Sequence, residues 1–291
     1  MMPPRSPPTK ISAVISDVDG TLMTDDKQLT ARAQAAVASL HRRGIIFTII
    51  SSRPPRGVRM LLDPLEIKTP FGCFNGGVIA RPDLSVITAH VLPPHVARRA
   101  VEMLSARGAQ CWIFAGPDWL VREAEAPYVG LEERTLRFRP AIVDDFGPAL
   151  DVAAKIVGVS GDFELLARCE REIGAALNGQ AVVVRSQPYY LDITHPLANK
   201  GVALSALATL LSVPPAEIAV IGDGGNDVAM FERSGLSIAM GNASPLVQRA
   251  ADFVIDTNRD EGFANAIDRF ILGGDRSKAP AGAAGTGAGA W

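Results

Sequence analysis

Four short segments of the chain combine residue types that can do chemistry. They are 17–22 (DVDGTL), 51–53 (SSR), 199–201 (NKG) and 222–227 (GDGGND). The first pairs Asp17 with Asp19, and carboxylates at this spacing can share nucleophilic and acid–base work when one is ionised and the other carries a proton. An Asp-x-Asp-Gly turn is equally common as a plain helix cap. Taken alone, this segment leaves catalysis and structure evenly matched.

Residues in the other three segments can bind anions or a metal ion. Ser51 and Arg53 offer a hydroxyl and a guanidinium to an anion, although serine is also an ordinary helix cap. Lys200 opens a predicted helix, where the helix dipole favours acids, so it indicates an anionic partner unless the lysine is simply solvated. Asp223 and Asp227 on a glycine-rich turn supply the hard oxygen ligands that Mg²⁺ prefers. The alternative is a Gly–Asp turn with a purely structural role.

Buried strands must position these segments. The apolar runs 11–16, 45–50 and 218–221 end where the first, second and fourth segments begin. In an open α/β sheet, ligands bind outside the carboxyl ends of the strands, so we expect the segments to serve one site. Between the first two runs, a helical pattern with one apolar face completes a βαβ unit.

The same alternation returns late in the chain. Helices are predicted over 201–211 and from about 226, and apolar runs lie near 236 and 253. Alternating strands and helices predict an α/β fold with a doubly wound parallel sheet, a Rossmann-like core. We expect this core to comprise residues 10–81 and 188–272. Residues 1–9 and the Gly/Ala-rich 273–291 are expected to be disordered tails.

Residues 82–187 are interpreted as an inserted α+β cap domain. The expected strands there are 86–92, 111–114, 119–122, 155–159 and 181–184, and the expected helices are 96–106 and 162–177. Trp112, Phe114 and Trp119 are interpreted as core residues rather than the lining of a substrate pocket, because aromatic residues in apolar runs usually pack. His195 lies on the loop that returns from the insertion to the core, and contact with substrate there is a less favoured interpretation.

Composition excludes several classes of protein. The 291 residues carry 29 Lys plus Arg and 31 Asp plus Glu, so no basic excess favours a nucleic-acid partner. No stretch approaches the ~20 apolar residues needed to span a bilayer, and the first ten residues lack the features of a signal peptide. We therefore expect a cytoplasmic protein with no membrane partner. Three widely spaced cysteines favour buried thiols over a disulfide framework or a zinc site.

Together, the four segments resemble the haloacid dehalogenase superfamily of phosphotransferases, from about residue 11 to 272. Asn75-Gly76-Gly77, the NKG triplet and 240–243 (MGNA) are similar to the Cof-type subgroup (HAD IIB, C2-capped phosphatases), whose cap is inserted between the second and third motifs. One departure is that the usual Thr-Gly-Arg is Ser-Ser-Arg here. The hydroxyl and the arginine are kept, but the glycine that would allow a close substrate approach is lost.

The resemblance implies a role for each matching residue. It makes Asp17 the nucleophile and Asp19 the general acid/base. The implied phosphate ligands are Ser51, Lys200, Arg53 and Asn226. The implied Mg²⁺ ligands are Asp17, the backbone carbonyl of Asp19, Asp223 and Asp227.

The expected function is that of a Mg²⁺-dependent phosphomonoester hydrolase. It would act through an aspartyl-phosphate intermediate on a small phosphorylated metabolite, with a sugar phosphate as the leading class, since a capped site suits a small ligand. One alternative is a phosphomutase of the same superfamily. Another, less favoured, is a non-catalytic protein that binds a phosphorylated metabolite. The sequence does not indicate the oligomeric state.

Overall fold

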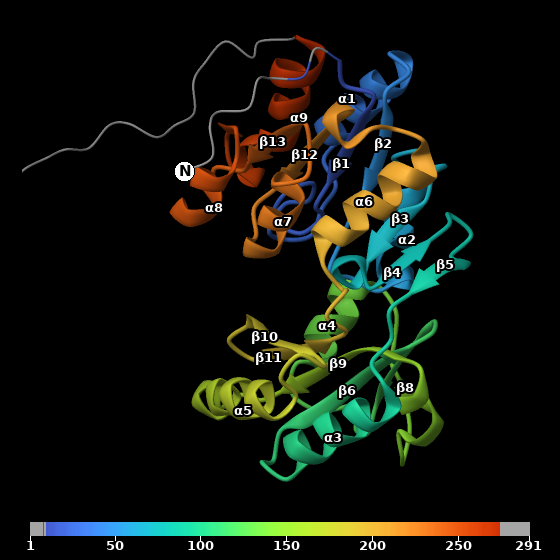
Figure 1. The fold of residues 1–291 in the computed structure, drawn as a ribbon, viewed down its shortest axis with the longest axis vertical. Helices are drawn as coiled ribbons and strands as arrows, with labels where there is room; N and C mark the ends of the chain where they lie inside the picture. The colour runs from blue at the N-terminus through green and yellow to red at the C-terminus, as the bar shows by residue number, and fades with distance from the viewer. Residues whose placement is uncertain (1–7, 9, 274–291) are drawn as a thin grey trace, which may run out of the picture. The chain divides into compact units, whose positions relative to one another are not determined.

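The chain forms two compact units (Figure 1). The computed structural model describes residue 8 and residues 10–273, so the expected tails, apart from residues 8 and 273, lie outside the described residues. Unit 1 is the chain up to Ile49 together with the chain from Ala208 onward, and unit 2 is Ile50–Leu207. Unit 2 contains the expected insertion 82–187 and also flanking residues that we expected to belong to the core. The boundaries of the cap domain stay a prediction.

Unit 1 is built on a parallel sheet with the strand order β14-β13-β12-β1-β2. Its strands are β1 (Ala13–Ser16), β2 (Ile46–Ile49), β12 (Ile218–Gly222), β13 (Leu236–Ala239) and β14 (Phe253–Val254). Every residue of the central strands β1 and β12 is buried, as expected for parallel strands with both faces covered. The predicted parallel α/β sheet is confirmed.

Short helices connect these strands. They are α1 (Ala31–Arg42), α7 (Val228–Phe231), α8 (Pro245–Ala250), α9 (Gly262–Ala266), the end of α6 (Lys200–Leu211), the 3₁₀ turns η3 (Pro215–Glu217), η4 (Gly225–Asp227) and η5 (Asn258–Asp260), and the π-helical turn η6 (Ile267–Leu272). Thr30 begins α1, because its hydroxyl accepts a hydrogen bond from the backbone N–H of Ala33 at 3.0 Å. The predicted apolar face of α1, which includes Val37 and Leu40, is buried and packs beside α9 and η6.

Unit 2 contains two sheets. The larger, called the cap sheet here, has the order β10-β11-β9-β6-β7-β8 and is antiparallel except between β7 and β8. Its strands are β6 (Gln110–Ala115), β7 (Asp118–Val121), β8 (Ala141–Ile142), β9 (Ala153–Val159), β10 (Val182–Gln187) and β11 (Tyr190–Thr194). The smaller sheet comprises β3 (Phe71–Cys73), β4 (Val78–Ala80) and β5 (Val86–Ala89). An inserted α+β region was predicted, but β11 and the hairpin β3–β4 were not.

The two faces of the cap sheet differ in the residues that they carry. The helices of unit 2 are α2 (Pro55–Leu62), α3 (Pro94–Ser105), α4 (Val129–Leu136), α5 (Phe163–Ala176) and the start of α6, with 3₁₀ turns η1 (Phe74–Gly76) and η2 (Gly147–Asp151). One face of the sheet, which includes Ile113 and Leu191, forms an apolar core with α3 and α5. Because side chains alternate along a strand, Trp112, Tyr190 and Asp192 lie on the opposite face, called the second face below.

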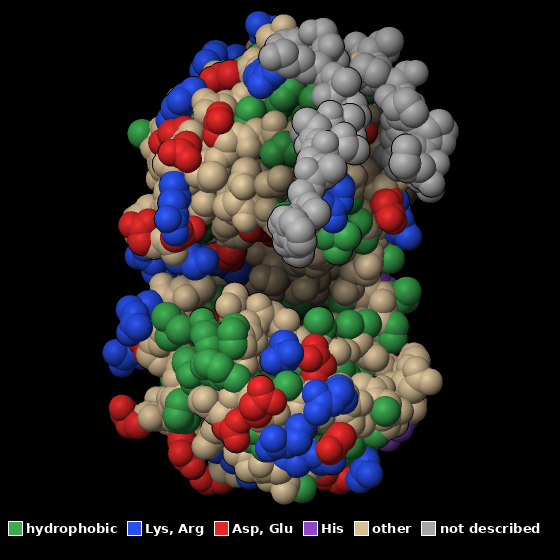
Figure 2. All heavy atoms as spheres, turned by 90° about the vertical axis from the view of Figure 1, so that its left-hand side faces the viewer, with side chains coloured by type: hydrophobic (Ala, Val, Ile, Leu, Met, Phe, Trp, Pro, Cys, Tyr) green, Lys and Arg blue, Asp and Glu red, His purple; other side chains and the backbone are tan. Residues whose placement is uncertain are grey.

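Three further observations bear on the class of protein. Figure 2 shows Lys and Arg side chains interspersed with Asp and Glu over the face that it draws. None of the described helices is long and apolar enough to cross a membrane. Cys73, Cys111 and Cys169 are buried free thiols, as expected.

Candidate active site

The pairing of β1 with β12 brings two of the predicted segments together in unit 1. Ser16 is in register with Ile221 in this parallel pair, so the two strands end at the same level. The backbone N–H of Asp17 extends the ladder by donating to the carbonyl of Ile221 at 2.9 Å. Asp17 and Asp223 therefore leave adjacent strands at one edge of the sheet. Ligand atoms of Asp17, Asp223 and Asp227 all lie within 4.8 Å of one another.

Asp227 fixes the glycine-rich turn that follows β12. Its side chain is fully buried, and its Oδ2 accepts hydrogen bonds from the backbone N–H groups of Asp223 at 2.9 Å and Gly224 at 2.7 Å. A Cβ at Gly222 would lie 2.5 Å from the Cγ of Asp227, so this approach requires glycine. The conformation of the Gly-Asp turn therefore depends on the carboxylate of Asp227 and on the glycine at 222.

Two side chains orient Asp223. The hydroxyl of Thr21 donates to its Oδ1 at 2.7 Å, and the amide of Asn242 donates to its Oδ2 at 3.3 Å and to the carbonyl of Gly20 at 2.9 Å. Both residues lie in segments quoted in the sequence analysis, but no role was predicted for either. Their pairing with Asp223 joins turns that follow three different strands, and spacing along the chain does not reveal it.

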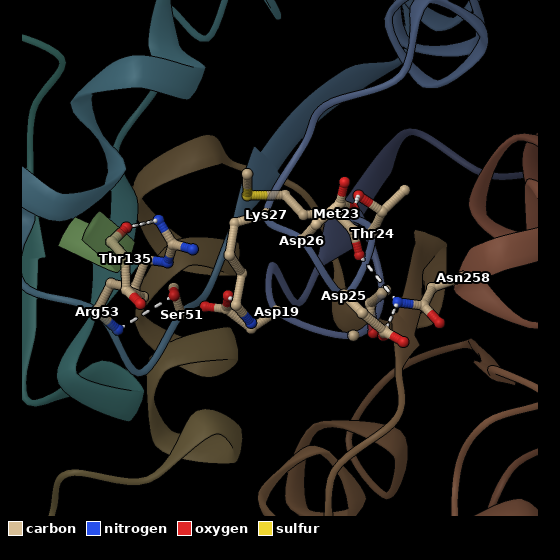
Figure 3. A network of polar contacts seen from close by, with 12 residues as sticks. Asp19, Met23, Thr24, Asp25, Asp26, Lys27, Ser51, Arg53, Thr135 and Asn258 are labelled. Carbon is tan, nitrogen blue, oxygen red and sulfur yellow. Dashed lines mark hydrogen bonds and ion pairs between the residues drawn. The ribbon is translucent and has the colours of Figure 1, made fainter. Parts of the chain in front are cut away.

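Asp19 lies on the same turn as Asp17 but outside the cluster of three carboxylates. Its Oδ1 pairs with the Nζ of Lys27 at 2.8 Å, and a quarter of its side chain is exposed (Figure 3). Lys27 reaches it because the chain turns back after Thr24, whose carbonyl accepts from the Lys27 N–H at 3.0 Å. No pattern in the sequence predicted Lys27. Its ammonium places a positive charge beside the carboxyl of Asp19.

The three carboxylates fit a divalent cation. Ligands on opposite sides of an octahedral Mg²⁺ are about 4 Å apart, so oxygen atoms within 4.8 Å of one another suit a single ion. Asp17 is 7% exposed and Asp227 is fully buried, and a bound cation offsets the cost of placing such carboxylates together. The carboxylate of Asp19 is not in this set. The ligand expected from Asp19, its backbone carbonyl, stays a prediction.

Ser51 and Arg53 of the second predicted segment, which lies in unit 2, are buried. Ser51 follows β2 by two residues, and its hydroxyl accepts from the backbone N–H of Arg53 at 3.1 Å. Nη1 of Arg53 donates to the carbonyls of Gly57 at 3.2 Å and Thr135 at 2.9 Å (Figure 3). Arg53 thus ties the segment to α4, a structural task that the sequence did not reveal. Its expected contact with phosphate stays a prediction.

The third segment forms the start of α6, also in unit 2. Asn199 caps the helix, since its Oδ1 accepts from the N–H groups of Gly201 at 2.8 Å and Val202 at 3.2 Å. Lys200 is 1% exposed, so the alternative of a solvated surface lysine is wrong. Gly76 has φ +93°, and a Cβ there would lie 2.4 Å from the Cβ of Ala203, which explains the glycine as a point of contact with α6.

The structure thus brings together some of the predicted residues within each unit. In unit 1, Asp17, Asp223 and Asp227 form one cluster and Asn226 lies in η4 between the last two. In unit 2, Ser51 and Arg53 share one loop and Lys200 begins α6. His195 is partly buried and stacks on His90, with ring centroids 5.6 Å apart.

Comparison with known proteins agrees with this arrangement. Residues 14–267 match the family described as haloacid dehalogenase-like hydrolase. A crystal structure of a haloacid dehalogenase-like hydrolase from Bacteroides thetaiotaomicron is 29% identical, with a TM-score of 0.83 over 90% of this chain and 100% of that one.

Two curated relatives extend the comparison. The HMP-PP phosphatase of Cronobacter sakazakii is 28% identical over 79% of this chain and 84% of its own. The 5-amino-6-(5-phospho-D-ribitylamino)uracil phosphatase YcsE of Bacillus subtilis is 25% identical over 90% and 96%. The chain is therefore an enzyme that belongs to the family of haloacid dehalogenase-like hydrolases.

Proposed function

We propose that the chain is a Mg²⁺-dependent phosphomonoester hydrolase that acts through an aspartyl-phosphate intermediate. The observation that carries this proposal is the cluster of Asp17, Asp223 and Asp227, whose ligand atoms lie within 4.8 Å of one another. The relatives reported above are named phosphatases, which supports the same reaction. Asp17, Asp223, Asp227 and the carbonyl of Asp19 would hold the cation, which supplies charge neutralisation for the phosphate and the attacking carboxylate.

Each catalytic aspartate has one task in this reaction. A carboxylate oxygen of Asp17 forms a bond to phosphorus as the ester oxygen leaves, and Asp19 gives that oxygen a proton. Asp19, now ionised, takes a proton from water, whose oxygen attacks the phosphoryl group and releases phosphate and free Asp17. The ion pair of Asp19 with Lys27 supports the second half of this cycle, in which Asp19 must be a base.

Four residues are proposed to bind the phosphoryl oxygens. They are Ser51, Arg53, Lys200 and Asn226. Lys200 is 1% exposed, which supports a role inside a site rather than at the solvated surface. The substrate is a small phosphorylated metabolite, with a sugar phosphate as the leading class. A cytoplasmic location is part of this proposal.

The alternatives are separated by what is released. A phosphomutase of the same superfamily would return the phosphoryl group to a second hydroxyl and release no phosphate. A non-catalytic binding protein would neither release phosphate nor form a phosphoenzyme.

The test is release of phosphate from a panel of phosphorylated metabolites and from 4-nitrophenyl phosphate, with Asp17→Asn and the matched surface variant Asp63→Asn. Asp17→Asn keeps the shape but removes the nucleophile, so turnover falls by about a thousandfold or more, while Asp63→Asn matches wild type. Equal melting temperatures for both variants in chelator show that the fold is kept. Turnover of Asp17→Asn within about tenfold of wild type, only ~1.4 kcal/mol in barrier, contradicts the proposal.

A further inference from the structure

A buried polar cluster lies on the second face of the cap sheet, entirely within unit 2. Lys155 on β9 pairs with Asp192 on β11, with Nζ and Oδ2 2.7 Å apart, and their side chains are only 13% and 6% exposed. The indole rings of Trp112 and Trp119 and the ring of Tyr190 lie on the same face of the sheet. The centroid of Trp112 lies 5.2 Å from each of the other two rings. Burying an ion pair costs desolvation free energy, which favours a functional reason for keeping it on this apolar face.

This cluster holds most of the unpaired polar atoms of the described chain. Within residue 8 and residues 10–273, five buried side-chain polar atoms have no hydrogen-bond partner. Four of them belong here: Nε1 of Trp112, Nε1 of Trp119, Oδ1 of Asp192 and the hydroxyl of Tyr190, which lies near the carboxyl of Glu132 without meeting hydrogen-bond geometry. Each such atom costs about 1–3 kcal/mol if nothing binds it, so their concentration in one place points to a bound species.

Helix α4 supplies a further polar group to the cluster. Glu132 lies close enough to Lys155, Tyr190 and Asp192 for each to affect its ionisation, with Arg53 as a fourth and weaker neighbour, and burial raises the pKa of its carboxyl. The helix is bounded by two non-glycine residues in the left-handed region, Tyr128 (φ 67°) and Arg137 (φ 62°). Strain of this kind is retained where a segment must be held in place for a function.

The unpaired atoms define the chemistry of the ligand. The two indole N–H groups require acceptors, Oδ1 of Asp192 requires a donor, and the hydroxyl of Tyr190 can be either. Lys155 and Asp192 neutralise each other and Glu132 is a further acid, so the cluster offers no surplus positive charge to a second anion. A neutral group that carries hydroxyl or amide functions matches these needs, and the aromatic rings suit its apolar faces. Buried water can satisfy the same atoms before such a ligand displaces it.

We infer that this cluster recognises the non-phosphate part of the substrate, and that this part is neutral and rich in hydroxyl or amide groups. The inference rests on the proposed function, which it makes more specific. Trp112 and Trp119 were expected to be core residues, and they are 1% exposed. The unpaired N–H of each ring is what the sequence could not show. Tyr190, Asp192 and Glu132 were not singled out at all.

The test compares two Tyr→Phe variants, each of which removes one hydroxyl from a different tyrosine. Tyr190→Phe removes a buried hydroxyl of the cluster, whereas Tyr128→Phe removes the hydroxyl of a half-buried neighbour whose ring lies 6.1 Å away. The substrates are ribose 5-phosphate for a polyol, uridine 5′-monophosphate for a planar amide, 2-phosphoglycolate for a second anion and 4-nitrophenyl phosphate as an ester without either function.

In Tyr190→Phe, kcat/KM for the better of the first two esters falls by about tenfold, as expected for one lost neutral hydrogen bond, mainly through KM. Turnover of 4-nitrophenyl phosphate stays within about twofold, and Tyr128→Phe matches wild type throughout. Which of the two esters is favoured tells a polyol from an amide. Preference for 2-phosphoglycolate, or equal behaviour of both variants on every ester, overturns the inference.

Binding provides a readout that does not depend on turnover. In excess chelator, the emission of Trp112 and Trp119 should respond to ribose 5-phosphate or uridine 5′-monophosphate, and Tyr190→Phe should weaken that response about tenfold. Absence of phosphate release with this response intact contradicts the proposed function alone. Phosphate release with no difference in binding between Tyr190→Phe and Tyr128→Phe contradicts the inference alone. Glu132→Gln, with Glu133→Gln as its control on the same helix, repeats the comparison from α4.

Discussion

Gly20 is predicted to be required because Asp223 occupies the space where a side chain would be. Its φ is +84°, and a Cβ there would lie 2.4 Å from Oδ2 and 2.9 Å from Cγ of Asp223. In Gly20→Ala, the carboxylate must therefore move. The movement disturbs the hydrogen bonds that Asp223 accepts from Thr21 and Asn242.

Gly44→Ala is the matched control. Gly44 has φ +69°, but a Cβ there has nothing within 4 Å. Both variants incur the left-handed backbone cost of about 1–2 kcal/mol, so both melt several degrees lower than wild type. Only Gly20→Ala also disturbs two hydrogen bonds to a charged group, and the loss of each would cost about 1.5–3 kcal/mol of stability. The difference between the variants isolates the contact with Asp223.

The assay is activity as a function of Mg²⁺ concentration, with melting temperatures in chelator and in Mg²⁺. Displacement of one of three carboxylates should raise the Mg²⁺ concentration for half-maximal activity about 10–100-fold in Gly20→Ala and leave Gly44→Ala at the wild-type value. The stabilisation by Mg²⁺ should shrink in the same variant. If both variants respond to Mg²⁺ as wild type does, the position of Asp223 does not control the metal and the reasoning is refuted.

Three further outcomes are expected. Asp19→Asn should give a rapid burst of at most about one equivalent of aryl alcohol from an aryl phosphate, then slow turnover. The water that attacks the phospho-aspartate would lose its base, so the covalent intermediate would accumulate. A rapid-quench experiment without a burst contradicts the acid/base role. Mg²⁺ at about 100 times its Kd should stabilise the fold by about 2.7 kcal/mol in thermal melts and support activity, whereas Ca²⁺ should support activity poorly; full activity in excess chelator is the contrary result. Partial burial and the stacked His90 lower the pKa of His195. The unfolded chain therefore binds more protons than the folded one, and the free energy of unfolding should fall as the pH drops below about 6.5. His195→Gln should flatten this dependence on pH in urea unfolding, and an unchanged dependence contradicts the prediction.

The sequence predicted the parts of the fold that rest on continuous apolar runs. β1 and β12 are buried on both faces, so each is apolar throughout, and the acidic segments follow at their ends. That pattern was sufficient to predict a parallel sheet, whereas the assignment of Asp17 and Asp223 to one metal site came from the family resemblance. The same reasoning did not predict β11, because its YLDIT pattern contains Asp192 at a buried position, where it pairs with Lys155.

Two other features left no signal in the sequence. Helix α4 has no side-chain cap and ends in left-handed residues that are not glycine, so none of the usual boundary residues marks it. Thr21 and Asn242 act on Asp223 from 202 and 19 positions away. Such contacts depend on how strands pair, which local spacing does not specify. The roles of Ser51, Arg53, Lys200 and Asn226 in binding phosphate stay predictions.

Because unit 2 is inserted between the two halves of unit 1, translation delivers the parts of the active site far apart in time. The turn after Asp17 is synthesised well before its partners, because Asn242 donates to the carbonyl of Gly20 across 222 positions and Asn258 donates to the carbonyl of Met23 across 235. At about 5–20 residues per second, that turn waits roughly 10–50 s for its partners. The strands of the cap sheet are all synthesised in the interval. A chain truncated between Thr194 and Asp223 would therefore contain every strand of the cap sheet but only one of the three clustered aspartates.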